Sequence, residues 1–142
     1  MKKLIALTSV LVAIVSCKQD KPVPPCVTDA ASIAKVYKIT AYTYKASATS
    51  PEIDYYSVLF PDACDRDNIM TFNINGTYQV TDVGSVCSPT GSDSGTWSLV
   101  GNTMQTDVGA LTIESFDCKK LVLGFTGLNV PGDKLKITYV AQ

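Results

Sequence analysis

Histidine is missing from all 142 residues of the chain. Histidine is the commonest general base in enzymes and the commonest protein ligand of transition metals, so its absence argues against hydrolytic and zinc chemistry. The chain also has no Gly-x-Ser-x-Gly elbow to expose a nucleophilic serine. We therefore predict a protein that is not an enzyme and that has no catalytic residue, no bound metal and no cofactor.

Charge of either sign is scarce as well. The chain has 12 basic and 13 acidic residues, and loss of Lys2 and Lys3 with a leader would change the formal net charge from −1 to −3. No basic stripe is present, so nucleic acid is not an expected partner. Removal of the first sixteen residues would leave 126, which is enough for one hydrophobic core.

One long apolar run is present, Leu4 to Val15, interrupted by Thr8 and Ser9. It is shorter than the roughly 20 residues that a transmembrane helix needs. Two lysines precede it, which is the pattern of a secretory signal peptide. We predict that residues 1–16 are a leader.

The leader ends in Ile14-Val15-Ser16-Cys17, which resembles the lipobox of bacterial lipoproteins. The resemblance implies cleavage before Cys17, attachment of diacylglycerol to its thiol, and acylation of its amine, for example with palmitate. Such lipids hold a protein to a membrane. They would place this one in the bacterial cell envelope, with the outer membrane as the expected site. A soluble secreted protein with a cysteine in its leader is the alternative.

Proline sets the next boundary. Pro22, Pro24 and Pro25 lie within residues 17–27, which we interpret as an extended tether between the lipid and the folded part. Residues 28–142 are then a single domain.

Beyond the tether, short stretches rich in Val, Ile, Thr, Tyr and Phe alternate with Gly, Asn, Asp and Pro, as in consecutive β-strands. A brief helix over Ala30 to Ala34, capped by Thr28 or Asp29, precedes them. The expected strands are 35–45, 55–60, 69–74, 77–83, 95–100, 103–107, 110–116, 120–126 and 134–140. This is an all-β chain.

The hairpin at Asn75-Gly76 tests the register of two strands. A two-residue turn there would pair apolar with polar side chains. A three-residue loop with a left-handed glycine instead sets Phe72 opposite Tyr78 and Met70 opposite Val80. Because a one-residue slip turns one apolar set outward, we expect the second register.

Two more turns extend the same apolar face. Gly101-Asn102 sets Leu99 opposite Met104, and Val108-Gly109 would set Met104 opposite Ile113. The result is an up-and-down antiparallel meander of about eight strands, which must close into a barrel or fold into a sandwich to hide that face.

Several of these features recur together in a known family. The relevant residues are Cys64-Asp65-Arg66-Asp67-Asn68, Phe72, Asn75-Gly76-Thr77-Tyr78, Cys87, Gly95-Thr96-Trp97 and Leu99. In this order they resemble the lipocalin-like domain of bacterial lipoproteins, over roughly residues 60–140. The resemblance implies an eight-stranded, calyx-like barrel. The family's first-strand Gly-x-Trp is absent, since Ala34-Lys35-Val36-Tyr37 stands there, so an open barrel and a β-sandwich remain alternatives.

The interior of such a barrel is the candidate site. Its ligand-facing residues are expected to be Met70, Phe72, Tyr78, Val80, Trp97, Leu99, Met104, Ile113, Leu121, Leu123, Phe125, Ile137 and Tyr139. One hypothesis is a membrane-anchored binding module for a small apolar or amphipathic molecule. The other is a structural or accessory envelope subunit whose filled barrel docks protein partners. A cavity of about 300 Å³ or more favours binding, and a solid core favours the accessory role.

Two further groups of side chains allow a functional and a structural interpretation. Asp62, Asp65, Asp67 and Asn68 offer oxygen ligands for calcium. They lack the EF-hand glycine and closing glutamate, and turns favour the same residue types, so we expect a structural role. The second group, which could line a pocket mouth or form a carbohydrate-contacting surface, contains Tyr37, Tyr42, Tyr44, Tyr55 and Tyr56. We expect packing for Tyr37 and leave Tyr55 and Tyr56 open.

Four cysteines besides Cys17 suit an oxidising compartment. The chosen hairpin register places Cys64 opposite residue 86, one position from Cys87, so we predict a bond between these two. The remaining pair is Cys26 and Cys118, which would staple the end of the tether to the barrel rim.

Overall fold

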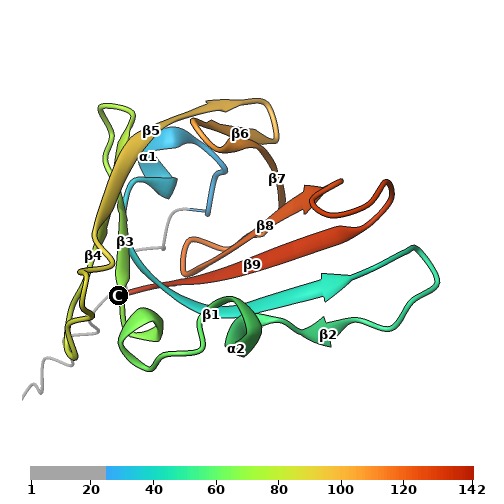
Figure 1. Ribbon diagram of the computed structural model, residues 1–142. Helices are drawn as coiled ribbons and strands as arrows, with labels where there is room; N and C mark the ends of the chain where they lie inside the picture. The colour runs from blue at the N-terminus through green and yellow to red at the C-terminus, as the bar shows by residue number, and fades with distance from the viewer. Residues whose placement is uncertain (1–24) are drawn as a thin grey trace, which may run out of the picture.

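A computed structural model describes residues 25–142, and these contain strands and three short helical segments (Figure 1). The strands are β1 (Val36–Lys45), β2 (Ile53–Asp54), β3 (Ile69–Phe72), β4 (Thr77–Thr81), β5 (Asp93–Val100), β6 (Thr103–Thr106), β7 (Gly109–Phe116), β8 (Lys120–Thr126) and β9 (Lys134–Ala141). The helices are α1 (Ala30–Ile33), α2 (Tyr56–Leu59) and a 3₁₀ turn at Cys64–Arg66. The leader, Cys17 and most of the predicted tether lie outside the described residues.

Eight of the strands form a closed antiparallel barrel. The order of neighbours is β1, β3, β4, β5, β6, β7, β8, β9, and β9 pairs with β1 again, from Tyr37 opposite Ala141 to Lys45 opposite Lys134. The short β2 is an extra strand on the edge of β1. The pairing of β9 with β1 closes the ring, and β2 covers part of the side of β1 that β3 leaves unpaired. The structure is therefore the expected barrel, neither open nor a sandwich.

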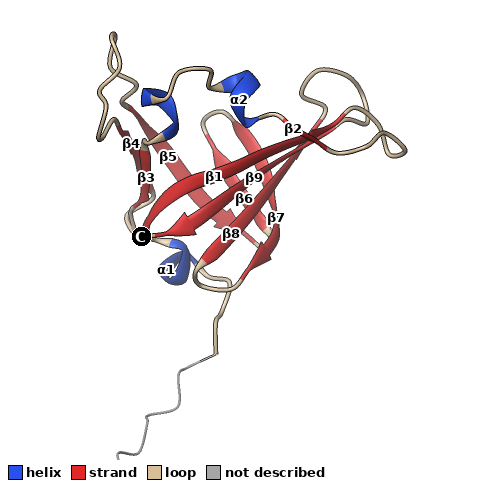
Figure 2. Ribbon diagram, turned by 90° about the horizontal axis from the view of Figure 1, so that it is seen from below, coloured by secondary structure: helices blue, strands red, loops and turns tan. Residues whose placement is uncertain are grey.

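The up-and-down path gives the barrel two different ends. At the open end, as we call it, the strands are joined by residues 46–68, 82–92, 107–108 and 127–133. At the closed end they are joined by residues 73–76, 101–102 and 117–119, and α1 lies here, opposite α2 (Figure 2).

The 73–76 hairpin has the predicted register. Phe72 lies opposite Tyr78 and Met70 opposite Val80. Gly76 has a φ of 83°, a backbone conformation that is unfavourable for residues other than glycine. Its position matches the predicted left-handed glycine. The next hairpin also follows the prediction, because Leu99 faces Met104.

The turn between β6 and β7 differs from the prediction. Asp107 and Val108 form it, so Met104 faces Leu111 and not Ile113. The two registers differ by two residues, and a two-residue shift keeps every side chain on its own face. Hydrophobic alternation therefore could not distinguish them.

The predicted strand at 55–60 is wrong. Ile53–Asp54 is the only strand there, and Tyr56–Leu59 form α2. The Asp54 carboxylate accepts a hydrogen bond from the backbone N–H of Tyr56 at 2.9 Å, which favours a turn over a continued strand. A short apolar run is compatible with either structure, and here the helix packs against β1.

The closed end is filled by side chains. Asp29 caps α1 by accepting from the backbone N–H of Ser32, as expected of one of the two predicted caps, and Ile33 is fully buried. Phe72 lies in edge contact with Trp97, with 5.4 Å between ring centroids. The indole N–H of Trp97 donates to the carbonyl of Asn73 at 3.0 Å, so this buried polar group is paired.

Each end carries one of the two predicted disulfides. Cys26 and Cys118 join at the closed end, with Cα atoms 5.7 Å apart. Cys64 and Cys87 join two connections of the open end, with Cα atoms 5.4 Å apart. The closed ring, its core and both disulfides all lie within residues 25–142, so this segment contains what a self-sufficient fold needs.

Candidate functional site

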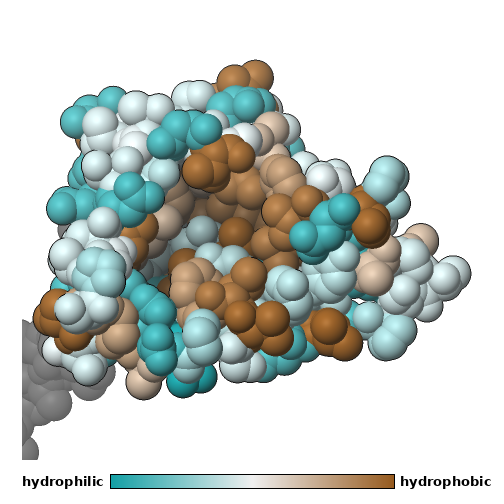
Figure 3. Space-filling model, viewed as in Figure 1, coloured by the Kyte–Doolittle hydropathy of each residue, from teal (hydrophilic) through white to brown (hydrophobic). Residues whose placement is uncertain are grey.

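A cavity of about 320 Å³ lies mainly in the open half of the barrel and reaches Phe72, Tyr78 and Met104 near the closed ends of their strands. All eight barrel strands contribute to its wall, and Val108 and Leu128 complete it from two connections of the open end. These two side chains are 76% and 44% exposed, so the cavity meets solvent there. The face drawn in Figure 3 is hollowed, and hydrophobic residues gather around the hollow.

Most of the predicted interior residues line this cavity. They are Met70, Phe72, Tyr78, Val80, Met104, Phe125, Ile137 and Tyr139. The rest of the predicted set does not line it and comprises Trp97, Leu99, Ile113, Leu121 and Leu123. Apart from the half-buried Leu99, these belong to the buried core. The expectation that they face a ligand is thus corrected: they point inward but pack against other side chains.

The wall also contains residues outside the predicted set, namely Tyr42, Asp93, Thr106, Val108, Leu111, Leu128 and Leu135. Leu111 was missed because of the register of the β6–β7 turn. Leu135 continues the alternation of Ile137 and Tyr139, so its inward orientation could have been predicted from the sequence. Val108 and Leu128 lie in turns, where alternation gives no information.

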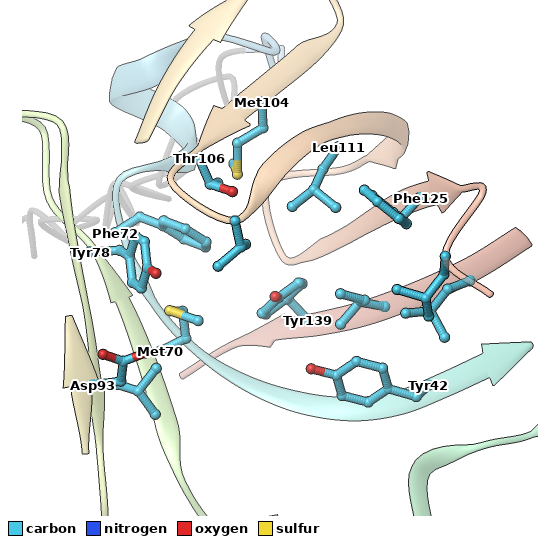
Figure 4. Close-up of a pocket in the computed structure, with 15 residues that line it drawn as sticks. Tyr42, Met70, Phe72, Tyr78, Asp93, Met104, Thr106, Leu111, Phe125 and Tyr139 are labelled. Carbon is cyan, nitrogen blue, oxygen red and sulfur yellow. The ribbon is translucent and has the colours of Figure 1, made fainter. Parts of the chain in front are cut away.

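Three tyrosine hydroxyls add polarity to an otherwise apolar wall. Figure 4 shows the oxygens of Tyr42, Tyr78 and Tyr139 on the cavity side of their rings. Burial raises the pKa of Tyr139, and the neighbouring hydroxyls of Tyr42 and Tyr78 raise it further. Burial is also the first cause of the raised pKa of Tyr42 and of Tyr78. All three phenols are therefore neutral near pH 7, and each can donate and accept a hydrogen bond.

A second cavity of about 230 Å³ adjoins the first. The two share Tyr42, Met70, Val80 and Asp93. Tyr56 of α2 belongs to the second wall, and its ring stacks on that of Tyr42 at 5.6 Å between centroids.

The remaining tyrosines of the predicted group pack. Tyr55 stacks on Tyr44, with centroids 5.1 Å apart. Tyr37 is fully buried against Phe72 and Tyr139, as expected. Its hydroxyl has no partner among the described residues, and burial raises its pKa to about 12.

A fully buried carboxylate holds the 127–133 connection in place. Asp133 accepts hydrogen bonds from the backbone N–H groups of Leu128, Asn129 and Val130 at 2.8–3.1 Å. It also accepts one from the hydroxyl of Tyr44. Burial alone would raise the pKa of Asp133, but these donors outweigh it and lower the pKa to about 2. The shape of this part of the cavity mouth therefore depends on an ionised Asp133.

The acidic cluster lies beside the 82–92 connection. Asp67 accepts from the backbone N–H of Ser85 at 2.9 Å, and Asp82, which was not among the candidates, accepts from those of Cys87 and Gly91. Such bonds are what Asp forms in structural turns. The second oxygens of Asp67 and Asp82 are buried without a partner among the described residues.

The geometry agrees with a comparison of the sequence with known families. A model described as a lipocalin-like domain matches residues 33–123. The chain belongs to this lipocalin-like family. The match runs from the end of α1 into β8, so most of the lipocalin-like barrel and most of the cavity wall lie within it. Proteins of this family are generally binding proteins without catalytic activity. No curated protein matches the chain. None of the helices in residues 25–142 is long and apolar enough to cross a membrane.

Proposed function

We propose that the lipocalin-like barrel binds one small apolar or amphipathic molecule in its 320 Å³ cavity. That cavity is the observation that carries the proposal. Ligand sites are typically concave, mostly apolar and equipped with a few polar groups, and an eight-stranded barrel has room for one small ligand. The wall here is apolar except for three tyrosine hydroxyls, Thr106 and Asp93.

The alternative, an accessory subunit that docks protein partners on its outer surface, needs no empty space inside the barrel. Only the closed half of the barrel meets that description. Its side chains include the fully buried Ile33, Leu121 and Leu123. The open half has space inside and an apolar mouth, which a filled scaffold does not require.

A neutral fluorescent probe, N-phenyl-1-naphthylamine, tests the binding function directly. We expect its emission to rise with residues 25–142 and to saturate at one probe per chain. Val80→Phe would fill part of the cavity and should weaken binding at least tenfold. Val100→Phe makes the same chemical change at a residue that is 65% exposed and outside the wall, and should bind as the parent does.

Failure of the parent chain to bind this probe or any other small apolar or amphipathic molecule would contradict the proposal and favour the accessory role. So would equal binding by both variants. Native mass spectrometry of the protein purified from its own host gives a second readout, since we expect a co-purifying small molecule that Val80→Phe loses.

We further propose that Cys17 carries the lipid and that the protein is attached to a membrane of the bacterial cell envelope, the expected one being the outer membrane. The lipobox-like sequence before Cys17 supports this. The disulfide at Cys26 adds that the chain enters the barrel at the closed end. A lipid only nine residues earlier would then hold this end toward the membrane and leave the cavity mouth on the far side.

Cys17→Ser should abolish labelling with a fatty-acid probe in the host and leave the leader uncleaved by the lipoprotein peptidase, because acylation needs the thiol. Equal labelling of parent and variant would overturn the anchor while leaving the binding proposal intact.

A further inference from the structure

Of the described residues that line the cavity, one has a charged side chain, and that charge is negative. Asp93 stands at the start of β5, exposed and beside the mouth, where Figure 4 places it near Met70. The adjoining cavity shares Asp93 and adds Asp65 as its only other charged group. Among residues 25–142, neither wall contains a lysine or arginine, so these residues offer no positive partner for an anionic headgroup.

The apolar part of the wall is rich in aromatic rings, from Tyr42, Phe72, Tyr78, Phe125 and Tyr139. The face of an aromatic ring carries negative charge density and attracts ammonium groups. The tyrosine hydroxyls on the cavity side offer oxygen acceptors as well. The ring faces interact more favourably with a cation than with a carboxylate, whereas the hydroxyls can pair with either.

The connections around the mouth carry an excess of the same sign, while Lys45 and Lys134 stand at the open ends of β1 and β9 and Lys136 pairs with Glu52. The connections of the open end contain eight acidic residues and a single basic one, Arg66. The acidic residues are Glu52, Asp54, Asp62, Asp65, Asp67, Asp82, Asp107 and Asp133. At the closed end, residues 25–35, 73–76, 101–102 and 117–119 contain two residues of each sign. An excess of one sign around a cleft raises the local concentration of ligands of the opposite sign.

We propose that the ligand is a cationic amphiphile, with an apolar body in the 320 Å³ cavity and a protonated amine or quaternary ammonium group at the mouth beside Asp93. This inference rests on the proposed binding function and narrows it to one class of ligand. Molecules with the same body and a carboxylate would meet no cation in the wall and an acidic rim at the mouth. The cavity therefore selects against fatty-acid-like ligands.

Three probes with one tail test the class of ligand: decyltrimethylammonium, decanol and decanoate, titrated by calorimetry into residues 25–142 at low ionic strength and below micelle formation. We expect the cation to bind tightest, the alcohol less tightly, and decanoate at least tenfold more weakly than the cation. A cation–π contact with a partly desolvated ring and one nearby carboxylate together justify a difference of about tenfold or more. Added salt should narrow the gap.

Asp93→Asn should weaken binding of the cation roughly threefold to tenfold and leave decanol unchanged, since it removes one nearby charge. The matched control is Asp62→Asn, which removes one exposed acid of the open end that lies outside both cavity walls. It should change the affinity for the cation less than twofold.

The outcomes separate the two proposals. Binding of decanoate as tight as that of the cation would overturn the ligand class and leave the binding function standing. Binding of none of the three, together with no response to N-phenyl-1-naphthylamine, would overturn the binding function itself. Equal losses in Asp93→Asn and Asp62→Asn would overturn the contact assigned to Asp93.

Discussion

The two halves of the barrel are built from the same strands and the same alternation of side chains, yet one half is solid and the other hollow. In the closed half, α1 inserts Ile33, and Trp97 packs edge-on against Phe72, which also lines the inner end of the cavity. In the open half, none of the helices within residues 25–142 enters the ring, and Phe125 and Leu135 border the cavity. The alternation of apolar and polar residues thus determines which side chains point inward. Whether these side chains pack against one another is determined by α1, which fills one end of the barrel.

The disulfides give the largest test of this comparison. In the chain-entropy model the stabilisation by a disulfide is a constant plus an amount that grows with the logarithm of the number of residues in the closed loop. Cys26 and Cys118 are 92 positions apart, and Cys64 and Cys87 are 23 apart. Replacing the closed-end pair by serine should cost about 4 to 5 kcal/mol, and replacing the open-end pair about 3 kcal/mol. Urea unfolding of the two double variants measures both, and a larger cost at the open end would reverse the comparison.

Truncation of one aromatic side chain in each half comes next. Trp97→Ala removes a buried indole and its hydrogen bond, and should cost about 4 kcal/mol. Phe125 is half-buried and borders existing space, so Phe125→Ala should cost roughly half as much. Equal free energies of unfolding for the two variants would show that the open half is packed as firmly as the closed half.

The ionised Asp133 makes the open half sensitive to acid. Its folded pKa of about 2 lies below the ordinary value of 3.8, so its contribution is complete above about pH 4 and is lost as the pH falls toward 2. The melting temperature of Asp133→Asn should therefore lie below that of the parent at pH 5 and approach it at pH 2.5.

Asp62→Asn, an exposed acid of the same end, serves as the control and should follow the parent at both values. A constant difference between Asp133→Asn and the parent would show that ionisation of Asp133 does not hold the 127–133 connection.

The smallest effect is expected for calcium, which should not change the stability of the folded protein. Asp67 and Asp82 already accept backbone N–H groups, as structural turn residues do. A ligand that binds only the folded state stabilises it by about 2.7 kcal/mol at a hundredfold excess over its dissociation constant. Millimolar calcium should leave the melting temperature unchanged. A clear rise would assign a metal site to the partnerless oxygens of Asp67 and Asp82.

Local patterns were sufficient to predict most of the barrel. The 73–76 hairpin could be predicted because a one-residue slip exposes Phe72 or Tyr78, which is costly. The same hairpin placed Cys64 near Cys87. The β6–β7 turn could not be predicted in this way, because pairing Met104 with Leu111 or with Ile113 buries the same face of both strands. The structure of the short apolar run at α2 could not be predicted either, since hydrophobic periodicity does not distinguish a four-residue helix from a strand.

The sequence was sufficient to predict many of the residues that line the cavity, but not how much empty volume they enclose. Alternation identifies Met70, Tyr78 and Tyr139 as inward residues. It cannot separate them from Leu121 and Leu123, which also point inward but are covered by neighbours in three dimensions. Asp93 and Val108 reach the cavity from a strand end and a turn, where the rule of alternation ends.

The most direct test of the account uses two methionines. Within residues 25–142 the chain has only Met70 and Met104, and both line the cavity, whereas Trp97 does not. Methyl-labelled methionine would therefore give two NMR signals from the site, and the indole N–H of Trp97 one signal from the closed half. On titration with decyltrimethylammonium, we expect both methyl signals to shift and saturate together while the indole signal stays in place. Stationary methyl signals, or shifts of the indole alone, would contradict binding in the open half of the barrel.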